Sequence, residues 1–346
     1  MSKKNNSKLI SDGMLGALII VIAALIVFAI VMSLFLIVAK PFSGGTGIVG
    51  SKQEATTTKY PFRQNFSFST PTFAENSVVI ETHTIKSERA VVLNVTDNKI
   101  VASRQAETVM YPASMTKVMT LITVYENLTS EAALNEILTI SKEVQERMEA
   151  EESSGYGFKA GEKLTVKELM YAMILRSDNI ACVTLAEYIA GSEANFVKLM
   201  NEKAKSLGLS QSTTLFQNCT GLHHIYHYTT CKDIATIMSY AMKNTFCAEI
   251  LTSLKCVPGS HFRPGEGSVF YNALLVHDLG EGQISPDNAT IKAGKSGFTD
   301  YDTSGQCLVS YAKADNGDEY IVVTSNAPAK PDRHNDHVFL YETYIE

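Results

Sequence analysis

Three short motifs in this chain of 346 residues carry side chains that could do nucleophilic chemistry. The first is Ser114-x-x-Lys117, which follows Tyr-Pro-Ala and precedes an apolar run. Pro112 can begin a helix but not continue one, so the serine should lie at a helix start. Residues three apart on a helix share a face, which would bring the lysine amine to the serine hydroxyl. A serine needs such a neighbouring base, and a lysine can act as one when burial or another cation lowers its pKa.

The second motif is Ser177-Asp178-Asn179, between two predicted helices, and the third is Lys295-Ser296-Gly297, at the end of a predicted strand. Each motif alone has a plainer interpretation: a helix cap with a solvated lysine, a helix end followed by a new cap, and a strand-end turn. Found together, in this order and in these settings, they are hard to attribute to chance.

The elements that must position these motifs are strands at both ends of the folded part and helices between them. Val91–Ala102 predicts a β-hairpin, and a capping box of Thr165 and Glu168 predicts a helix over Val166–Arg176. Further helices are expected from Asn179 to before Gly191, up to Gly208 and around Ile234–Ala241; further strands at Ile291–Gly297, Leu308–Ala312 and Tyr320–Ser325; and a last helical segment at Val338–Ile345. The predicted fold class is α/β (α+β): an antiparallel sheet built from both chain ends, flanked by helices, with an inserted helical subdomain.

On these motifs the chain resembles the superfamily of penicillin-binding proteins and β-lactamases, and within it the low-molecular-weight serine D-alanyl-D-alanine carboxypeptidases. The resemblance covers roughly Ser77 to the C-terminus and implies a β-lactamase/transpeptidase-like fold. It includes Tyr-Pro-Ala-Ser-Met-Thr-Lys at 111–117, Gly-Glu-Lys-Leu-Thr-Val-Lys-Glu-Leu-Met at 161–170, Leu-Arg-Ser-Asp-Asn-Ile-Ala at 175–181, Asn-Ala-Leu-Leu at 272–275 and Gly-Lys-Ser-Gly-Phe-Thr at 294–299.

The resemblance implies a role for each residue of the first two motifs. Ser114 would attack the carbonyl between two D-alanines, and Lys117 would take and return its proton. Ser177 would pass a proton toward the leaving amine, and Asn179 would hold the substrate amide. The implied partners are a peptidoglycan stem peptide that ends in D-Ala-D-Ala, and β-lactam antibiotics as covalent inhibitors; no cofactor and no metal are implied.

The third motif would bind the other end of the substrate. Lys295 would supply positive charge for the substrate carboxylate and lower the pKa of a nearby lysine, and Ser296 would donate a hydrogen bond to the carboxylate. Gly297 lies between them and Phe298, whose backbone amide would form the oxyanion hole with that of the nucleophile. Arg333, in Pro-Asp-Arg-His, is expected near the carboxylate site.

Two positions depart from the family's usual pattern without removing a chemical group. Asp178 is the choice of β-lactamases where the family more often has Gly or Ala, and Lys-Ser-Gly replaces the commoner Lys-Thr-Gly. A β-lactamase is one alternative, but no Glu-x-x-Leu-Asn segment follows Asn179. A catalytically silent peptidoglycan-binding protein is another, although it would be expected to lack the serine or a lysine. Transpeptidation stays open, because the shape of the cleft selects water or an amine as acceptor.

The N-terminus predicts a membrane anchor. Met14–Ala39 is uncharged, almost wholly apolar and long enough to cross a bilayer, whereas a signal peptide would have a shorter apolar core. The expected organisation is a cytoplasmic tail (1–13), an uncleaved anchor (14–39), a flexible linker rich in Gly, Ser and Thr (40–76) and a D,D-peptidase domain (77–346). The domain would face outward from the cell membrane, and since the chain ends soon after Arg333, the N-terminal helix would do the anchoring.

Composition narrows the partners further. The formal net charge of -6 and the pI near 5.8 give no basic surface for nucleic acid. Six cysteines would face an oxidising compartment, so a bridge between Cys219 and Cys231 is one possibility, and buried thiols are the other. His223, His224 and His227 lack the glutamate of a His-Glu-x-x-His motif, and a surface loop is expected there rather than a metal site.

Overall fold

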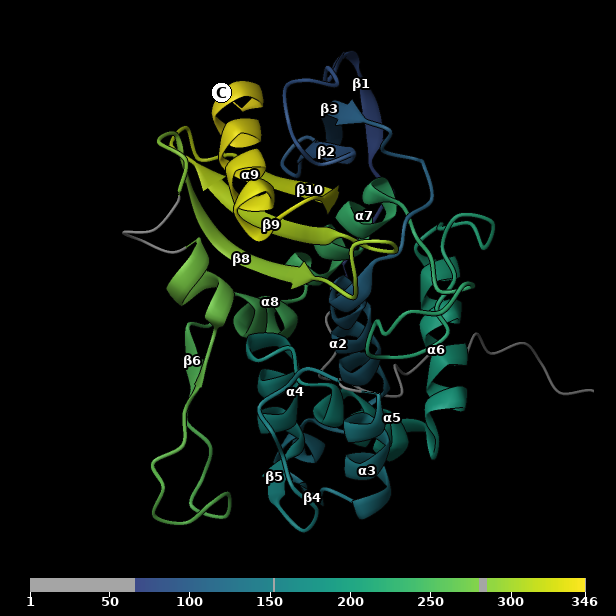
Figure 1. Ribbon diagram of the computed structural model, residues 1–346, viewed down its shortest axis with the longest axis vertical. Helices are drawn as coiled ribbons and strands as arrows, with labels where there is room; N and C mark the ends of the chain where they lie inside the picture. The colour runs from purple at the N-terminus through teal and green to yellow at the C-terminus, as the bar shows by residue number, and fades with distance from the viewer. Residues whose placement is uncertain (1–65, 152, 280–284, 346) are drawn as a thin grey trace, which may run out of the picture. The chain divides into compact units, whose positions relative to one another are not determined.

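The computed structural model describes residues 66–151, 153–279 and 285–345 (Figure 1). The predicted cytoplasmic tail, the anchor at Met14–Ala39 and most of the predicted linker lie outside these residues. Within the described ranges, none of the helices is both long and apolar enough to span a bilayer.

A six-stranded sheet joins the two ends of the described chain, as the sequence predicts. Its strands are β1 (Thr72–Val79), β2 (Arg89–Asn94), β3 (Lys99–Arg104), β8 (Ala289–Gly297), β9 (Gln306–Ala314) and β10 (Glu319–Ala327), in the spatial order β1-β3-β2-β10-β9-β8. Four of the pairings are antiparallel, but β1 runs parallel to β3. The sheet is therefore mixed, not purely antiparallel, and it begins inside the segment predicted as linker.

The edge strand β1 escaped prediction for a physical reason. Most of its side chains are exposed, so its sequence carries no alternation of apolar and polar residues. The central strands behave differently: Val91 and Leu93 of β2 face one apolar core, while Val92 between them faces another. Buried strands carry a period that sequence can show, and an exposed edge strand does not.

Helices fill the middle of the chain. They are the short turns η1 (Ala113–Met115) and η2 (Glu131–Asn135), the π-helix η3 (Leu274–Asp278), and α2 (Thr116–Asn127), α3 (Lys142–Ala150), α4 (Val166–Leu175), α5 (Asn179–Ala190), α6 (Glu193–Ser206), α7 (Cys231–Lys243), α8 (Thr245–Thr252) and α9 (Lys330–Tyr344). Two small hairpins pair β4 (Ile137–Thr139) with β5 (Lys163–Thr165), and β6 (Lys255–Cys256) with β7 (Phe270–Tyr271). The helices α3 and α8 were not predicted.

Local signals at the helix ends are confirmed. The Thr165 hydroxyl accepts a hydrogen bond from the Glu168 amide at 3.1 Å, and the Glu168 carboxylate accepts one from the Thr165 amide at 2.7 Å, which completes the predicted capping box. The helix α5 ends at Gly191, whose φ of 74° lies in the left-handed region that glycine favours. The C-terminus of α4 and the N-terminus of α5 set the position of Ser177, which lies between these two helices.

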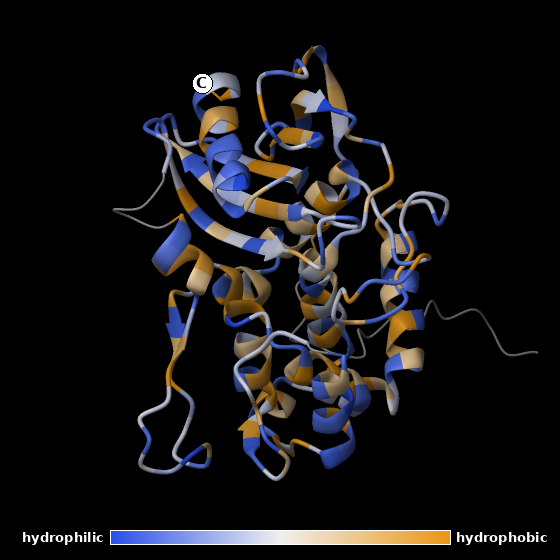
Figure 2. Ribbon diagram, in the orientation of Figure 1, coloured by the Kyte–Doolittle hydropathy of each residue, from blue (hydrophilic) through white to orange (hydrophobic). Residues whose placement is uncertain are grey.

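Helices cover both faces of the sheet (Figure 1). The helix α7 packs on the face that looks toward α2 and the other central helices, and α9 packs on the opposite face against β9 and β10. Apolar residues gather along the strands and on the helices below the sheet (Figure 2). One apolar core is therefore shared by the sheet and the central helices, and a second lies between the opposite face of the sheet and α9.

The helix α9 begins at Lys330, well before the predicted Val338. Pro331 stands in its first turn, and four buried polar residues follow: Arg333, His334, Asp336 and His337. The His337 ring bonds to Ser310 at 2.7 Å, which shows why a polar stretch can be core-facing. A hydropathy pattern alone treats such residues as solvated, so it placed the helix start too late.

All six cysteines carry free thiols, and five of them are buried. The Cys219 thiol donates to a Glu193 carboxylate oxygen at 3.1 Å, and the Cys231 thiol lies 3.8 Å from the Ser325 hydroxyl. The bridge between Cys219 and Cys231 is therefore not formed, and the alternative of buried thiols holds.

Candidate active site

Ser114 lies in the 3-10 turn η1, directly before α2, and Lys117 lies in the first turn of that helix. The Lys117 ammonium nitrogen donates to the Ser114 hydroxyl at 2.9 Å and to the Thr220 carbonyl at 2.7 Å. Its side chain is fully buried, and burial lowers its pKa against the opposing influence of Cys182, Cys219 and Asp178. A lysine whose pKa is lowered by burial is a better acceptor for the serine proton than a solvated lysine.

Two glycines let other chain segments approach the backbone of Ser114. A side-chain carbon at Gly221 would overlap the Ala113 carbonyl, and one at Gly297 would lie 2.8 Å from the Pro112 carbonyl oxygen and 3.1 Å from the Ser114 nitrogen. Ala113 itself has a φ of 45°, which an alanine adopts only under strain. The Ser114 amide is thus bordered by the end of β8 and by the loop that contains Gly221.

The third motif meets the second across the cleft. The Lys295 ammonium nitrogen donates to the Ser177 hydroxyl at 3.0 Å and to the Ser296 carbonyl at 2.9 Å. Burial, followed by the positive charge of Lys117, holds the pKa of Lys295 well below its ordinary value. Ser177 has a φ of 55°, a second strained residue in the site. An anion bound here would relieve the repulsion between the two lysines.

Asn179 points an unused acceptor into the cleft. Its side-chain oxygen is buried and has no hydrogen-bond partner among the described residues. A buried acceptor without a partner is costly, and a substrate N–H would satisfy it. Asn179 lines a cavity of about 400 Å³ together with Ser114, Glu151, Ser153, Ser154, Thr220, Gly221, Leu222, His223, Phe298 and Thr299.

A smaller cavity of about 120 Å³ lies on the other side of Ser177. It is lined by Ile174, Leu175, Arg176, Ser177, Asn272, Ala273, Leu274, Gly294, Lys295 and Ser296. The motif residues thus divide between two neighbouring spaces, with the nucleophile and the free amide acceptor in the larger one. Ser177, Lys295 and Ser296 border the smaller one.

Asp178, the departure from the family pattern, ties a wall of the cleft to α5. One carboxylate oxygen accepts from the Ala181 amide at 2.7 Å and so caps the helix, and the other accepts from the Tyr156 amide at 2.6 Å. The Asn179 amide donates to the Ser154 carbonyl at 3.3 Å in the same loop. Asp178 therefore holds the segment that lines the cavity opposite the β8 strand.

Arg333 lies behind the cleft. Its guanidinium donates to Gln306 at 2.7 Å and to His334 at 3.2 Å, and it lines neither cavity. Its charge still contributes to the lowered pKa of Lys295. Arg333 therefore influences the pKa of Lys295 through its charge, and its side chain lines neither of the two cavities.

The histidines of the loop after Gly221 divide into two kinds. His223 and His224 are exposed, as a surface loop requires, but His227 is buried, and the surface prediction is wrong for it. Its Nδ1 accepts from the Gln217 amide at 3.1 Å, so the ring proton lies on Nε2, which donates to the Thr116 hydroxyl at 2.8 Å. Burial lowers the pKa of His227 to about 3. In the part of the chain that the structure describes, no group of three or more His, Cys, Asp or Glu residues could hold a metal ion.

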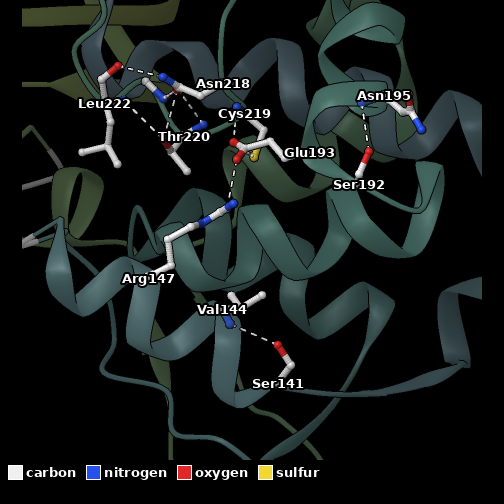
Figure 3. Close-up of polar contacts among 11 residues, drawn as sticks. Ser141, Val144, Arg147, Ser192, Glu193, Asn195, Asn218, Cys219, Thr220 and Leu222 are labelled. Carbon is white, nitrogen blue, oxygen red and sulfur yellow. Dashed lines mark hydrogen bonds and ion pairs between the residues drawn. The ribbon is translucent and has the colours of Figure 1, made fainter.

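The sequence did not show what holds the Thr220 carbonyl against Lys117, namely the loop around Asn218, whose polar contacts Figure 3 shows. The Asn218 side-chain oxygen accepts from the amides of Thr220 and Gly221, and its nitrogen donates to the Leu222 carbonyl at 2.8 Å. Glu193 then ties this loop to the helices.

The Glu193 carboxylate accepts from the Cys219 amide at 2.9 Å on one side and pairs with Arg147 of α3 at 2.9 Å on the other (Figure 3). An Asn three residues before a Gly-containing turn is a weak local signal of such a loop. The link to Glu193, 26 positions away from Cys219, has no signal in the sequence.

In this fold a serine and a fully buried lysine lie in hydrogen-bond contact, and a second buried lysine bonds to a second serine across the cleft, an arrangement suited to acyl transfer. The chain belongs to the D-alanyl-D-alanine carboxypeptidase family, whose pattern it matches over residues 75–329.

Curated relatives agree with this assignment. The chain is 31% identical over 233 residues to D-alanyl-D-alanine carboxypeptidase DacF of Bacillus subtilis, which covers 67% of this chain and 55% of the relative. It is 31% identical over 175 residues to DacC of Escherichia coli, covering 50% of this chain and 43% of the relative. The chain thus spans about half the length of these two relatives.

Solved structures show the same fold. The Streptomyces K15 DD-transpeptidase superposes with a TM-score of 0.63 at 24% identity, covering 75% of this chain and 97% of that one. A D-alanyl-D-alanine carboxypeptidase from Mycobacterium tuberculosis gives a TM-score of 0.63 at 22% identity, covering 78% of this chain and 94% of that one. The implied β-lactamase/transpeptidase-like fold is confirmed for the described residues.

Proposed function

We propose that this protein is a serine D-alanyl-D-alanine carboxypeptidase that removes the terminal D-alanine from peptidoglycan stem pentapeptides. The observation that carries the proposal is the fully buried Lys117 amine, 2.9 Å from the Ser114 hydroxyl. Family membership supports the substrate class, because the relatives bear the name of this reaction.

Acylation begins when Ser114 attacks the carbonyl carbon between the two D-alanines and Lys117 takes the hydroxyl proton. The amides of Ser114 and Phe298 stabilise the negative charge on the carbonyl oxygen. The C–N bond then breaks, and the proton returns to the leaving amine through Ser177, which lies 3.0 Å from Lys295. Lys295 and Ser296 bind the carboxylate of the departing D-alanine.

Deacylation needs water at the same ester. Once D-alanine has left the smaller cavity, water can enter, and Lys117 can take its proton in the reverse sense. A β-lactam keeps its leaving group tethered to the acyl group, so the same step is blocked and the ester persists. This difference makes penicillin an inhibitor rather than a substrate.

The test uses the full-length protein in detergent with a peptide that ends in D-Ala-D-Ala. We expect stoichiometric release of D-alanine, and labelling by penicillin at the peptide that contains Ser114. Fast turnover of penicillin without D-alanine release would favour a β-lactamase instead. Addition of a peptide amine as acceptor measures transpeptidation, which the name of the Streptomyces neighbour raises as a second candidate.

We also propose that Met14–Ala39 anchors the enzyme and that residues from Pro41 onward lie outside the cell. The support is the uncharged apolar length of this segment. Full-length protein should remain with membranes, and protease added to intact cells should cut within the linker. Protection of the large domain in intact cells, or release of a shortened form without protease, contradicts the topology.

A further inference from the structure

Besides the two cavities on either side of Ser177, a further one, called the second cavity below, continues the cavity of Ser114 away from the leaving-group side. It has a volume of about 250 Å³, and four of its residues, Glu151, Thr220, Leu222 and His223, also line the cavity of the nucleophile. The remaining residues are Arg147, Met148, Glu193, Gln217, Asn218 and His224. Because Lys295 and Ser296 border the space on the other side of Ser177, the acyl part of a substrate must extend toward this second cavity.

Most polar groups of the second cavity already have partners (Figure 3). Arg147 pairs with one Glu193 oxygen at 2.9 Å, and the other oxygen accepts from both the amide and the thiol of Cys219. The Asn218 side chain is used within its own loop. The His224 ring nitrogen Nδ1 accepts from the Tyr226 amide at 3.1 Å. These groups shape the cavity and have little capacity left for a ligand.

Glu151 is different. It caps the C-terminus of α3, and its carboxylate makes no hydrogen bond and no ion pair within the described ranges. Partial burial raises its pKa; Arg147 acts against this and Glu193 adds to it. With the Arg147 charge taken by Glu193, Glu151 is the carboxylate at the junction of the two cavities that can still receive a cation.

We propose that Glu151 is a specificity-determining residue that binds a free primary amine on the donor side chain immediately before D-Ala-D-Ala. This inference rests on the proposed carboxypeptidase function. The Leu222 side chain, shared by both cavities, would contact the methylene stem of such a residue, as amphipathic side chains require. The exposed His223 also lines both cavities.

The test compares two peptides that differ only in that amine: Nα-acetyl-lysyl-D-alanyl-D-alanine and its Nα,Nε-diacetyl counterpart. The wild-type enzyme should release D-alanine from the free-amine peptide with kcat/KM about fivefold higher, as expected for an exposed charge pair. In Glu151→Gln the two peptides should agree within about twofold, and in Glu151→Lys the preference should reverse. The wild-type preference should also shrink at high salt.

Two controls keep the outcomes distinct. Glu146→Gln removes a charge from the same helix at a residue that pairs with Lys142 and lines neither cavity, so the preference should be retained. Benzylpenicillin has no free amine, so Glu146→Gln should be acylated by it at the wild-type rate, and penicillin labelling of Glu151→Gln shows that this variant is folded. Equal cleavage of both peptides by the wild type, or an undiminished preference in Glu151→Gln, overturns the proposal for Glu151. Failure to cleave either peptide overturns the proposed function itself.

Discussion

The floor and the mouth of the cleft are built in opposite ways. On the floor, Lys117 is 0% exposed and Asn179 is 2% exposed. At the mouth, Phe298 is 42% exposed, and Tyr301, whose ring packs against it, is 61% exposed. The floor is fixed by many backbone contacts, whereas the mouth offers side chains that contact little protein. Chemistry in this molecule therefore depends on burial, and recognition depends on groups left free.

Burial gives the floor its chemical character. In a dry site a lysine amine loses part of its preference for the charged form, and hydrogen bonds gain strength. The same burial makes each unpaired group costly, which explains why carbonyls such as that of Thr220 are placed on Lys117. Groups at the mouth face water, so burial changes their pKa and the strength of their hydrogen bonds less. Substitutions there should therefore have smaller effects on activity and stability.

The largest expected effect is at the nucleophile and its base. Ser114→Ala should abolish penicillin labelling, since the proposed ester forms on the Ser114 hydroxyl. Lys117→Ala should slow acylation by about 10²–10⁴-fold, because general-base assistance has that size. Peptide mass mapping after penicillin treatment measures both. Labelling that survives in Ser114→Ala would mean that the floor has been assigned to the wrong residue.

Gly155→Ala tests whether the wall of the cleft that Asp178 holds is packed as tightly as the floor. The new methyl group would overlap the Asp178 carboxylate, which must then release Tyr156 or Ala181. We expect a loss of about 1–3 kcal/mol in the free energy of unfolding, as for overpacking, and slower acylation.

The matching control adds Asp178→Gly to the same chain. Because the clash is then absent, Gly155→Ala should cost little further stability in that background. Additive losses in the double variant would show that the two residues do not act as a unit.

His227 gives the floor a signature in pH. Its pKa falls from an ordinary value near 6.5 to about 3 on folding, so the unfolded chain takes up a proton that the native state refuses. Stability should therefore fall as the pH drops below about 6.5, by at most about 1.4 kcal/mol per pH unit from this group. In His227→Asn the dependence should be shallower, with buried His334 and His337 supplying the rest.

Denaturant unfolding between pH 4 and pH 8 measures how the free energy of unfolding changes with pH. These limits cover about the range in which histidine titrates in unfolded chains. His224→Asn, at the exposed mouth, should leave the slope as in the wild type. A shallower pH dependence of stability in both variants would show that buried His227 and exposed His224 contribute alike.

The smallest expected effect is at Phe298. Its amide is the part that we propose for the oxyanion hole, and its exposed ring packs edge-on against Tyr301 at 5.0 Å. Phe298→Ala should therefore acylate with penicillin within about threefold of the wild-type rate. Phe298→Pro, which lacks the N–H, should lose about 10²–10³-fold. Equal losses in the two variants would show that the ring, rather than the amide, matters.

The sequence predicted the residues whose roles depend on local spacing. Ser114 and Lys117 are three positions apart, and one helical turn suffices to join them. The family match carried the distant pair of Ser177 and Lys295, which are 118 positions apart and which no local rule can connect. Helix ends with a capping box or a terminal glycine were also predictable, because those signals act over a few residues.

What the sequence missed depends on tertiary contacts of polar groups. The Thr220 carbonyl has no side-chain signal, and it lies 103 positions from Lys117. His227 and the first half of α9 look solvated, since burial of a polar residue depends on partners elsewhere in the chain. Glu151 belongs to none of the motifs, and its position at the junction of two cavities shows only in the structure.

The pairing of β2 with β10 also bears on how the enzyme comes into being. Asn94 and Tyr320 face each other in the sheet, 226 residues apart. A chain that emerges from the ribosome N-terminus first displays the nucleophile early but cannot complete the sheet, or supply Lys295, until its last quarter has been made. Long-range strand pairing of this kind also slows folding. The acylating site is therefore assembled last, and a chain cut short before β8 would carry Ser114 without a reaction to perform.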